Sequence, residues 1–388
     1  MKNKINTSNS FPSIKKSFFT FLLFFTTVNS GFAEDNLAYF DPMDVFDLEW
    51  ATDPRVSPDG KSIVYIRKAN DIMKDRERSN LWQISIDGND HRPLYSGLNS
   101  IRSPRWSPNG KKLAYVSNDT GSQQIHVRWM DDGETAVISQ LQQSPSSLSW
   151  SPDGKWLAFT MDVKSESESI AEPRDKPVGA KWAKEPITVT STRYQWDGQG
   201  IMEPAYRHVF IIPSDGGSAK QLTFGEFNHF GSLAWAPDSQ KIFFSAHRSE
   251  NWELVSDEAD IYSVDIITKD LKQISDEVGA ERSPSISPNG KMIAYSFEER
   301  RPLAYSPNQV AIMDINGNNK RIISKNLDGD ADNLQWSDDN RSIFFSYDER
   351  GIRKIGQLML NGEIKNITND LGGTTLGRPY LSGSYHHS

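Results

Sequence analysis

One short motif constrains this chain more than any other feature, because it recurs along the sequence. It reads Ser-Pro-Asp/Asn-Gly-Lys and is followed by a run of β-forming residues, most clearly at Arg105–Tyr115 and Trp150–Phe159. Successive copies are 44–51 residues apart, with one gap of 85. Repetition at about 40–50 residues indicates a propeller, a solenoid or another repeat array. The second residue of the motif, proline in five copies and aspartate in the last, is at Pro58, Pro108, Pro152, Pro237, Pro288 and Asp338.

The local pattern selects the propeller. Proline presets the first corner of a turn, Asp or Asn caps the backbone, and glycine accepts a positive φ. Runs such as Leu157–Phe159 then read as strands, and a second hairpin follows, as in Leu81–Ile86, Asp87–Gly88 and Arg92–Tyr95. No unit has a helical period. Four antiparallel strands per unit predict an all-β propeller with six recognisable blades.

The repeated residues themselves are expected to have a structural role. The Asp and Lys of the motif are expected to serve the turn and to face solvent. Large aromatic surfaces usually pack between elements. We therefore expect Trp106, Trp150, Trp235 and Trp336 to lie between neighbouring blades.

The 85-residue gap holds one blade with an insertion. Residues 161–205 are polar, contain proline and lack strand periodicity at first, so they are expected to leave the blade as a long excursion. The excursion joins the second strand of its blade to the third. It should therefore rise from the face opposite the Ser-Pro-Asp-Gly turns.

The N-terminus has a separate pattern. Lys15 and Lys16 precede an apolar run at Phe18–Val28, and small residues follow at Gly31 and Ala33. This is typical of a secretory signal peptide, residues 1–33, cut after Ala33. An N-terminal membrane anchor is the alternative, although eleven residues are too few to span a bilayer, which needs about 20. We expect an exported protein, periplasmic or secreted, that has no membrane segment after cleavage.

Charge and cysteine content exclude some functions. The chain has a formal charge of −8, and removal of residues 1–33 takes away four lysines and no acid, so that the charge becomes −12. Nucleic-acid binding needs clustered basic residues and is not expected. There is no cysteine, so no disulfide framework and no thiol nucleophile is possible.

Several further segments occur in the same order as the matching segments of one known family. Together they resemble the N-terminal propeller of the prolyl oligopeptidase family of serine peptidases, in its acylaminoacyl-peptidase and dipeptidyl-peptidase-like branch. The resemblance runs from Asp41 to the C-terminus, and the excursion carries its more specific part, since TolB-type propellers share Ser-Pro-Asp-Gly. The segments are Phe40–Asp44, Asp53–Lys61, Lys176–Trp182, Tyr194–Gly200, His208–Phe210, Gly216–Gly217 and Gln221–Gly225.

This resemblance implies a seven-bladed propeller that covers an α/β-hydrolase domain with a Ser, Asp and His triad. The chain departs from that pattern. A nucleophile elbow needs Gly-x-Ser-x-Gly, and no such string occurs. Residues 377–385 look like the start of a seventh blade. We expect residues 34–388 to be a propeller that is incomplete at its C-terminus, with the hydrolase domain absent from this chain.

No residue set is assigned to catalysis, to a cofactor or to a metal. Asp328, Asp330 and Asp332 alternate as in calcium loops, but Asn333 and Asp339 stand where an EF-hand needs glycine and glutamate. A solvated acidic loop is the preferred interpretation, and metal binding stays open. The histidines follow no hydrolase pattern, at positions His91, His126, His208, His229, His247, His386 and His387.

Two functions remain. The first is the substrate-gating propeller of an exported serine peptidase, with peptides as substrates and a C-terminal α/β-hydrolase domain as partner, itself inactive without that domain. The second is a non-catalytic, TolB-like periplasmic propeller that binds a protein partner. The reading frame beyond Ser388 distinguishes them.

Overall fold

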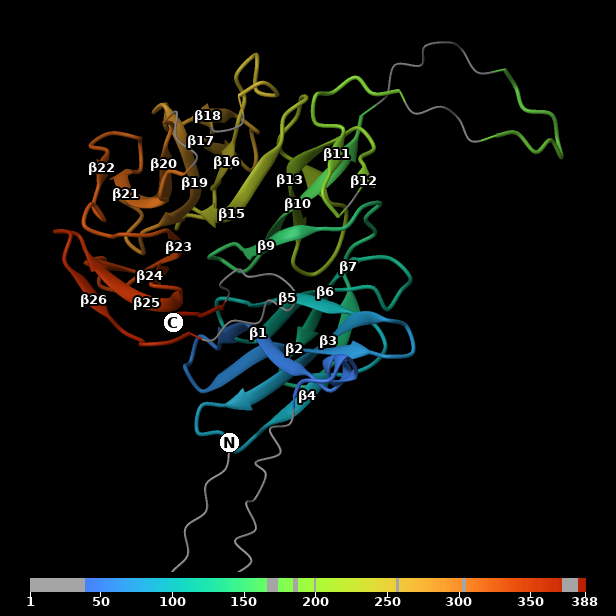
Figure 1. Cartoon of the computed structure of the whole chain (residues 1–388), viewed down its shortest axis with the longest axis horizontal. Helices are drawn as coiled ribbons and strands as arrows, with labels where there is room; N and C mark the ends of the chain where they lie inside the picture. The colour runs from blue at the N-terminus through green and yellow to red at the C-terminus, as the bar shows by residue number, and fades with distance from the viewer. Residues whose placement is uncertain are drawn as a thin grey trace, which may run out of the picture. The chain divides into compact units, whose positions relative to one another are not determined.

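The structure is a computed structural model (Figure 1). Its contacts divide the chain into residues 1–42 and 43–388, and all repeats belong to the second unit. A short 3-10 helix, η1 (Pro42–Phe46), lies at the boundary between them. Among the described residues, no helix has the length and apolarity of a membrane span. The structure describes residues 39–165, 174–183, 188–198, 200–255, 258–301, 305–371 and 383–388.

The repeats form six four-stranded antiparallel sheets, which confirms the predicted propeller. Blade 1 contains β1 (Glu49–Val56), β2 (Ser62–Asp71), β3 (Arg76–Ser85) and β4 (Arg92–Tyr95). Blade 2 contains β5 (Ile101–Trp106), β6 (Lys112–Ser117), β7 (Gln124–Trp129) and β8 (Thr135–Val137). Blade 3 contains β9 (Ser146–Trp150), β10 (Trp156–Lys164), β13 (Ala205–Pro213) and β14 (Lys220–Gln221).

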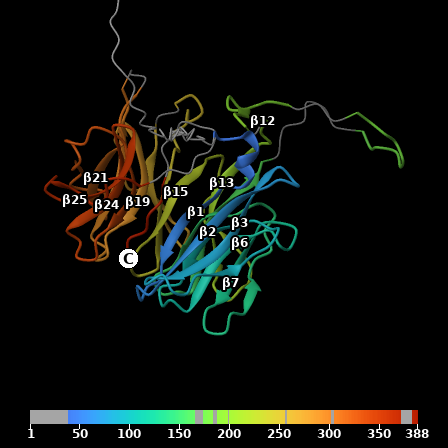
Figure 2. The ribbon, with the colours of Figure 1, turned by 60° about the horizontal axis from the view of Figure 1, so that its bottom comes forward.

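The remaining blades repeat the same order. The first strand of each blade contacts the first strand of the next, from β1 to β23, and the sheets follow one another in chain order (Figures 1 and 2). Blade 4 contains β15 (His229–Trp235), β16 (Lys241–Ala246), β17 (Asp260–Asp265) and β18 (Leu271–Gln273). Blade 5 contains β19 (Gly279–Ile286), β20 (Met292–Glu299), β21 (Gln309–Asp314) and β22 (Arg321–Ile322). Blade 6 contains β23 (Ala331–Trp336), β24 (Ser342–Glu349), β25 (Ile352–Met359) and β26 (Ile364–Asn366).

The Ser-Pro-Asp-Gly motif is the hairpin turn between the first two strands of a blade. In blade 1 the Ser57 hydroxyl bonds the Asp59 carboxylate at 2.6 Å and accepts the N–H of Ser62 at 2.9 Å. Asp59 also accepts the N–H of Lys61, and Gly60 has φ of +69°. The motif therefore closes its own hydrogen bonds, which confirms its architectural role.

Four tryptophans join neighbouring blades, as predicted. Trp106 Nε1 donates to the carbonyl of Arg55 at 3.0 Å, and Trp150 Nε1 donates to the carbonyl of Arg105 at 2.9 Å. Trp235 and Trp336 make the same bond to the preceding blade at 3.4 and 2.9 Å. Each indole thus packs its ring between two sheets while its polar N–H is satisfied.

The imperfect copies of the motif add bonds between blades. Where other copies have glycine, blade 4 has Ser239 with φ of +60° and blade 6 has Asn340 with φ of +61°. The Ser239 hydroxyl accepts the N–H of Asp153 in blade 3, and the Asn340 amide oxygen accepts the N–H of Asn289 in blade 5. These side chains satisfy backbone donors in the preceding turn, for which glycine has no group to offer.

The excursion is shorter than the predicted residues 161–205. β10 continues to Lys164 and pairs with β13 along its length, so the excursion covers residues 165–204. The polar residues that read as loop are cross-strand partners: Asp162 bonds Arg207 at 2.8 Å on an exposed extension of the ladder. The excursion contains a small hairpin, β11 (Gln195–Trp196) and β12 (Gly200–Ile201). It joins the second and third strands of blade 3, as expected.

Candidate functional site

The first strands of five blades, all except blade 5, line a hollow of about 740 Å³. Its lining includes Arg55, Arg105, Ser147, Ser149 and Asn333, all from first strands. The strands are rigid because each pairs with its own sheet and contacts the first strand of a neighbouring blade. The walls of the hollow therefore belong to paired strands, and they carry both polar and apolar side chains.

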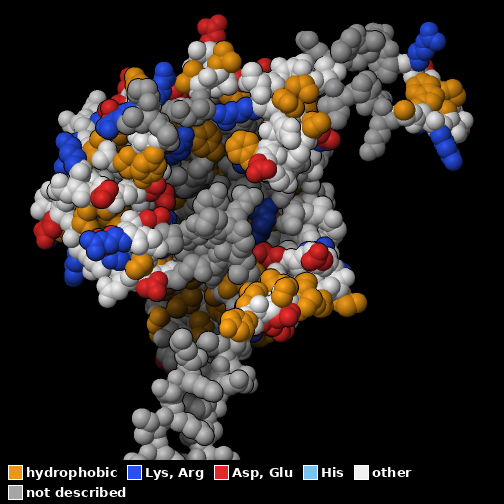
Figure 3. All heavy atoms as spheres, in the orientation of Figure 1, with side chains coloured by type: hydrophobic (Ala, Val, Ile, Leu, Met, Phe, Trp, Pro, Cys, Tyr) orange, Lys and Arg blue, Asp and Glu red, His pale blue; other side chains and the backbone are white. Residues whose placement is uncertain are grey.

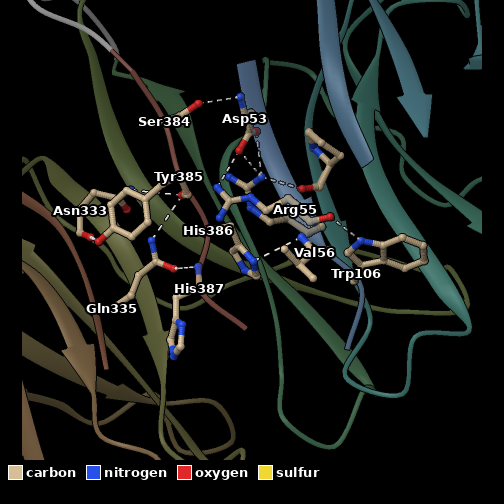
Figure 4. A network of polar contacts seen from close by, with 12 residues as sticks. Asp53, Arg55, Val56, Trp106, Asn333, Gln335, Ser384, Tyr385, His386 and His387 are labelled. Carbon is tan, nitrogen blue, oxygen red and sulfur yellow. Dashed lines mark hydrogen bonds and ion pairs between the residues drawn. The ribbon is translucent and has the colours of Figure 1, made fainter. Parts of the chain in front are cut away.

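Two arginines share one carboxylate in this hollow. Asp53 bonds Arg55 at 2.6 Å and Arg105 at 2.9 Å (Figure 4). Burial, and next the charge of Arg105, lower the pKa of Arg55. Two guanidinium groups against one carboxylate leave one positive charge in excess. Such a site can hold a carboxylate or another small anion.

The C-terminal segment Gly383–Ser388 borders the hollow on the side of blade 1. The Ser384 hydroxyl accepts the backbone N–H of Asp53 at 3.1 Å, and Nδ1 of His386 accepts the N–H of Val56 at 3.3 Å. Burial lowers the pKa of His386 to about 4, so its ring is neutral at physiological pH and can act as this acceptor.

The same segment also binds blade 6. Tyr385 donates its hydroxyl to the carbonyl of Asn333 at 2.5 Å, and the N–H of His387 donates to Gln335 at 2.8 Å. The ring of His387 lies 4.2 Å from that of Phe344. The segment thus lies between β23 and β1, where the first strand of a seventh blade would lie (Figure 4). Of the predicted start at 377–385, residues 377–382 lie outside the described residues.

A second hollow, of about 1050 Å³, lies beside the excursion. Its walls come from the excursion, from the ladder of β10 and β13, and from the loops between β14 and β15 and between β16 and β17. Thr192 fixes the excursion to that loop: its backbone N–H donates to the Glu253 carboxylate at 3.4 Å. The lining includes the aromatic residues Tyr194, Trp196 and Trp252 together with several carboxylates. We call this space the excursion hollow.

One serine and histidine pair lies next to the excursion hollow. The Ser249 hydroxyl is 2.7 Å from Nε2 of His247. A catalytic pair also needs a group that orients the histidine. The nearby Glu258 instead bonds Arg300 at 2.6 Å and accepts the N–H of Gly279 at 3.2 Å. No carboxylate of the described chain hydrogen-bonds this imidazole, so the pair is not assigned to catalysis.

The other histidines have structural surroundings. His91 lies on the Trp82 ring at 5.1 Å, and His126 stacks on Tyr115 at 5.3 Å. The rings of His208 and His229 lie 5.2 Å apart between blades 3 and 4. These contacts fill sheet faces and joints.

The His208 and His229 pair is held neutral. Nδ1 of His229 donates to the carbonyl of Arg207 at 2.7 Å, and Nε2 accepts from Arg248 at 2.8 Å. Nδ1 of His208 is 3.3 Å from the Thr223 hydroxyl. Burial first, and then neighbouring positive charge, lower the pKa of His208 to about 4; burial is also the main cause that lowers the pKa of His229 to about 3.

A buried and a half-buried carboxyl group lie in the next joint, between blades 4 and 5. Glu281 is 0% exposed, and neither of its oxygens has hydrogen-bond geometry to a described residue. Burial raises its pKa to about 7. Burial, and next the charge of Glu258, raise the pKa of Asp260 to about 6. Both carboxyl groups therefore stay protonated up to pH values at which an ordinary carboxyl group is ionised.

The acidic loop has other partners. Asp330 accepts the backbone N–H of Asn308 at 2.7 Å, and Asp332 bonds Arg353 at 2.9 Å. In the described ranges, no group of three or more His, Cys, Asp or Glu side chains is arranged to hold a metal ion.

The site residues that sequence reasoning missed are the ones that depend on neighbouring blades. Arg55 and Arg105 occupy the same place in the first two copies of the motif, two residues before its serine. An alignment of the copies against one another would have shown two positive charges at one level of the hollow. No repeated sequence pattern identifies Glu281, because the neighbouring blade is what buries it.

Comparison with known proteins agrees with this architecture. The TolB beta propeller domain matches residues 64–340. The chain belongs to this family. An uncharacterized peptidase of Bacillus subtilis, YuxL, is 30% identical over 208 residues, which are 53% of this chain and 31% of that protein. Dipeptidyl-peptidase 5 of Porphyromonas gingivalis is 25% identical over 338 residues, 83% of this chain and 48% of that protein.

A solved structure has a similar fold. Acylaminoacyl peptidase of Pyrococcus horikoshii superposes with a TM-score of 0.64 and 16% identity, over 84% of this chain and 47% of that one. These relatives bear out the resemblance to the propeller of prolyl-oligopeptidase-family peptidases. This chain spans less than half the length of each of the three.

Proposed function

We propose that this chain is the substrate-gating propeller of an exported serine peptidase. One observation carries the proposal: the match to dipeptidyl-peptidase 5 runs over 83% of this chain but only 48% of that protein. The matched portion is a propeller, and the sequence holds no Gly-x-Ser-x-Gly elbow. Peptide hydrolysis would then belong to a separate α/β-hydrolase domain, with the propeller controlling which peptides reach it.

The distribution of apolar side chains supports a partner domain. Exposed apolar patches commonly mark interaction surfaces. In Figure 3 such side chains gather in several patches separated by charged ones. Among the described residues, the loops of the motif face expose Ile86 and Ile267. The loops of the opposite face expose many more, including Ile72, Met73, Leu98, Phe224, Leu254, Val278 and Tyr305.

Export is part of the same proposal. Its support is the basic, apolar and small-residue pattern before Glu34, which lies outside the described residues. A mature protein beginning at Glu34 is expected, and N-terminal sequencing of exported material measures it. Exported protein that retains Met1 would instead indicate an anchor.

The decisive experiment separates gate from catalyst. The reading frame is sequenced past Ser388, and residues 34–388 are compared with a chain extended by any hydrolase domain found there. Both are incubated with acylaminoacyl and aminoacyl chromogenic substrates and with a fluorophosphonate probe. We expect turnover and serine labelling only in the extended chain. A natural stop near Ser388 would favour the partner-binding propeller, and turnover by residues 34–388 would mean that the active site lies within them.

A further inference from the structure

The hollow lined by the first strands, which we call the first-strand hollow, gathers its positive charge on one side. Arg55 in β1 and Arg105 in β5 both line it, and none of the described lining residues is an aspartate or a glutamate. Since β1 contacts β5, the two guanidinium groups belong to adjacent walls. They meet at Asp53, which bonds Arg55 at 2.6 Å and Arg105 at 2.9 Å (Figure 4).

The two arginines are not required by the repeat. They occupy the position two residues before the serine of the motif, or before the alanine that replaces it in blade 4. In the other four blades this position has a neutral side chain, although the same turn and the same sheet form there. The positive charge is therefore particular to blades 1 and 2. The neutral residues are Ser149, Ala234, Ser285 and Gln335.

The contact with Asp53 leaves most donors of the two guanidinium groups unused. Each guanidinium has five N–H donors. The described residues bond Arg55 at Nη2 and Arg105 at Nη1 only, through Asp53 and the carbonyl of Pro104. Nε of Arg55 is buried and has no acceptor among them. The pair can thus donate to a further acceptor without giving up Asp53.

The charge of this cluster is also unbalanced. Two guanidinium groups oppose one carboxylate, and His386 adds no charge at physiological pH because burial lowers its pKa to about 4. Burial, and next the charge of Arg105, lower the pKa of Arg55, so the two positive groups repel each other. The chain as a whole has a formal charge of −8. A local positive excess in an acidic protein favours a specific anion at this place.

Apolar side chains lie beside the charged cluster. The lining includes Trp106, Leu148, Trp150 and Leu233. The volume of about 740 Å³ has room for an apolar group as well as an anion. The prolines of two motif turns line the hollow too, so it reaches the motif face of the propeller. These features suit a ligand that joins an anionic group to an apolar one.

We propose that the first-strand hollow binds the carboxylate of a peptide at Arg55 and Arg105, with the adjoining apolar side chain on the apolar lining. Guanidinium groups pair with carboxylates through two parallel hydrogen bonds, which fix the orientation of the ligand. The carboxylate can be that of the peptide C-terminus or that of an acidic side chain. This inference rests on the proposed function for its choice of a peptide as ligand.

Binding is measured directly, without any hydrolysis. Purified protein is titrated in a calorimeter with acetyl-Ala-Ala-Phe, with acetyl-Ala-Ala-Phe-amide and with acetyl-Ala-Glu-Phe-amide. The free acid or the glutamate peptide is expected to bind about tenfold or more tightly than the neutral amide, since the amide lacks the charge-assisted contact. Tight binding of the free acid would assign the C-terminal carboxylate, and tight binding of the glutamate peptide would assign the side chain. Equal binding of all three peptides would overturn the proposal.

Two variants with opposite expected effects locate the site. Arg105→Gln removes one of the two positive charges, so affinity for the carboxylate peptide should fall about tenfold or more. Asp53→Asn keeps the shape of the cluster and removes the carboxylate already bound there, so affinity should rise. A thermal melt shows that each variant is folded. Unchanged affinity in folded Arg105→Gln, or a lower affinity in folded Asp53→Asn, would refute the site.

The matched control is Arg282→Gln. Arg282 also lies on a first strand, β19, and bonds Glu298 at 2.9 Å, but it does not line the hollow. Its side chain is 32% exposed, against 25% for Arg105. The control should leave the affinity unchanged, and an equal loss in both arginine variants would show that the ligand does not bind in the hollow. Hydrolysis by an extended chain is a separate readout, so failure here leaves the gating proposal intact.

Discussion

Two neighbouring joints of the propeller solve the same packing problem with opposite chemistry. The joint of blades 3 and 4 contains Trp235, which donates to the preceding blade, and the neutral pair His208 and His229. The joint of blades 4 and 5 has Ile286 in the tryptophan position and the buried carboxyl group of Glu281. Hydrogen bonds cross both joints, but the second joint also encloses an acid, whose carboxyl group lies near the hydroxyl groups of Ser275 and Tyr295.

The difference gives the joints opposite responses to pH. The pKa values of His208 and His229 are lowered by folding to about 4 and 3, so the unfolded chain binds more protons below pH 6.5 and the first joint weakens as the pH falls. The pKa of Glu281 is raised by folding to about 7, so its contribution is fully present below pH 4.5 and is lost as the pH rises through 7. These buried ionisable groups therefore lower the stability of the fold at both low and high pH.

The largest expected effect concerns Trp235, the tryptophan that joins blades 3 and 4. Trp235→Ala removes a buried indole from the first joint and should lower the free energy of unfolding by about 3–5 kcal/mol. Ile286→Ala removes a half-buried side chain from the second joint and should cost roughly 1 kcal/mol. Urea denaturation at pH 7 measures both. Equal losses would show that tryptophan does not distinguish the joints.

The next effect is a gain of stability in the second joint. Glu281→Gln keeps the size of the side chain and cannot ionise, so at pH 8 it should stabilise the fold by about 3 kcal/mol. At pH 4.5 the gain should disappear, because the native glutamic acid is then also neutral.

The control for this substitution is Glu363→Gln, an exposed glutamate in the hairpin of blade 6. It should change the free energy of unfolding little at either pH. A gain in the Glu281 variant that is equal at pH 4.5 and 8 would mean that packing, and not charge, is responsible.

The third effect is on the acid side of the first joint. His208→Phe keeps a ring against His229 but has no proton to bind. Between pH 7 and pH 5 the variant should therefore lose about 2 kcal/mol less stability than the native protein. Thr223 still accepts the N–H of Val209 at 2.9 Å, so the cost at pH 7 should be small. Denaturation midpoints across pH 4–8 measure the slope. An unaltered slope would place the acid sensitivity elsewhere.

The smallest effect tests the imperfect motif of blade 4. Ser239→Ala removes the acceptor of the Asp153 N–H and should cost about 1 kcal/mol. Ser239→Gly removes the same bond but relieves the positive φ of 60°, so its net effect should be near zero. If both substitutions cost the same, the positive φ of this position has no measurable weight.

The repeated parts of the fold could be predicted from the sequence because their causes are local. Ser57, Asp59 and Gly60 satisfy one another within a turn, so their spacing alone indicates the hairpin. The tryptophans could be placed between blades because a large ring at a repeated position has no other surface to cover. Six blades follow from six copies.

The sites could not be predicted because their causes are non-local. Asp260 in β17 and Glu281 in β19 belong to no repeated position of the motif, and only the docking of blades 4 and 5 brings the two carboxyl groups near each other. The carboxylates of the excursion hollow come from two loops, the excursion and a strand ladder, and none of them repeats. The start of the excursion was misplaced by four residues because Asp162 and Lys164 read as loop, whereas Asp162 is the cross-strand partner of Arg207.

The indole bonds between blades have a direction. In all four cases the tryptophan belongs to the later blade, and the carbonyl that it finds belongs to the earlier one. Ser239 and Asn340 follow the same rule, since each reaches back to a turn made before it. A chain that leaves the ribosome N-terminus first thus meets, with each new blade, an acceptor that already exists. The propeller can be assembled in the order of its synthesis, with each blade acting as the template for its successor.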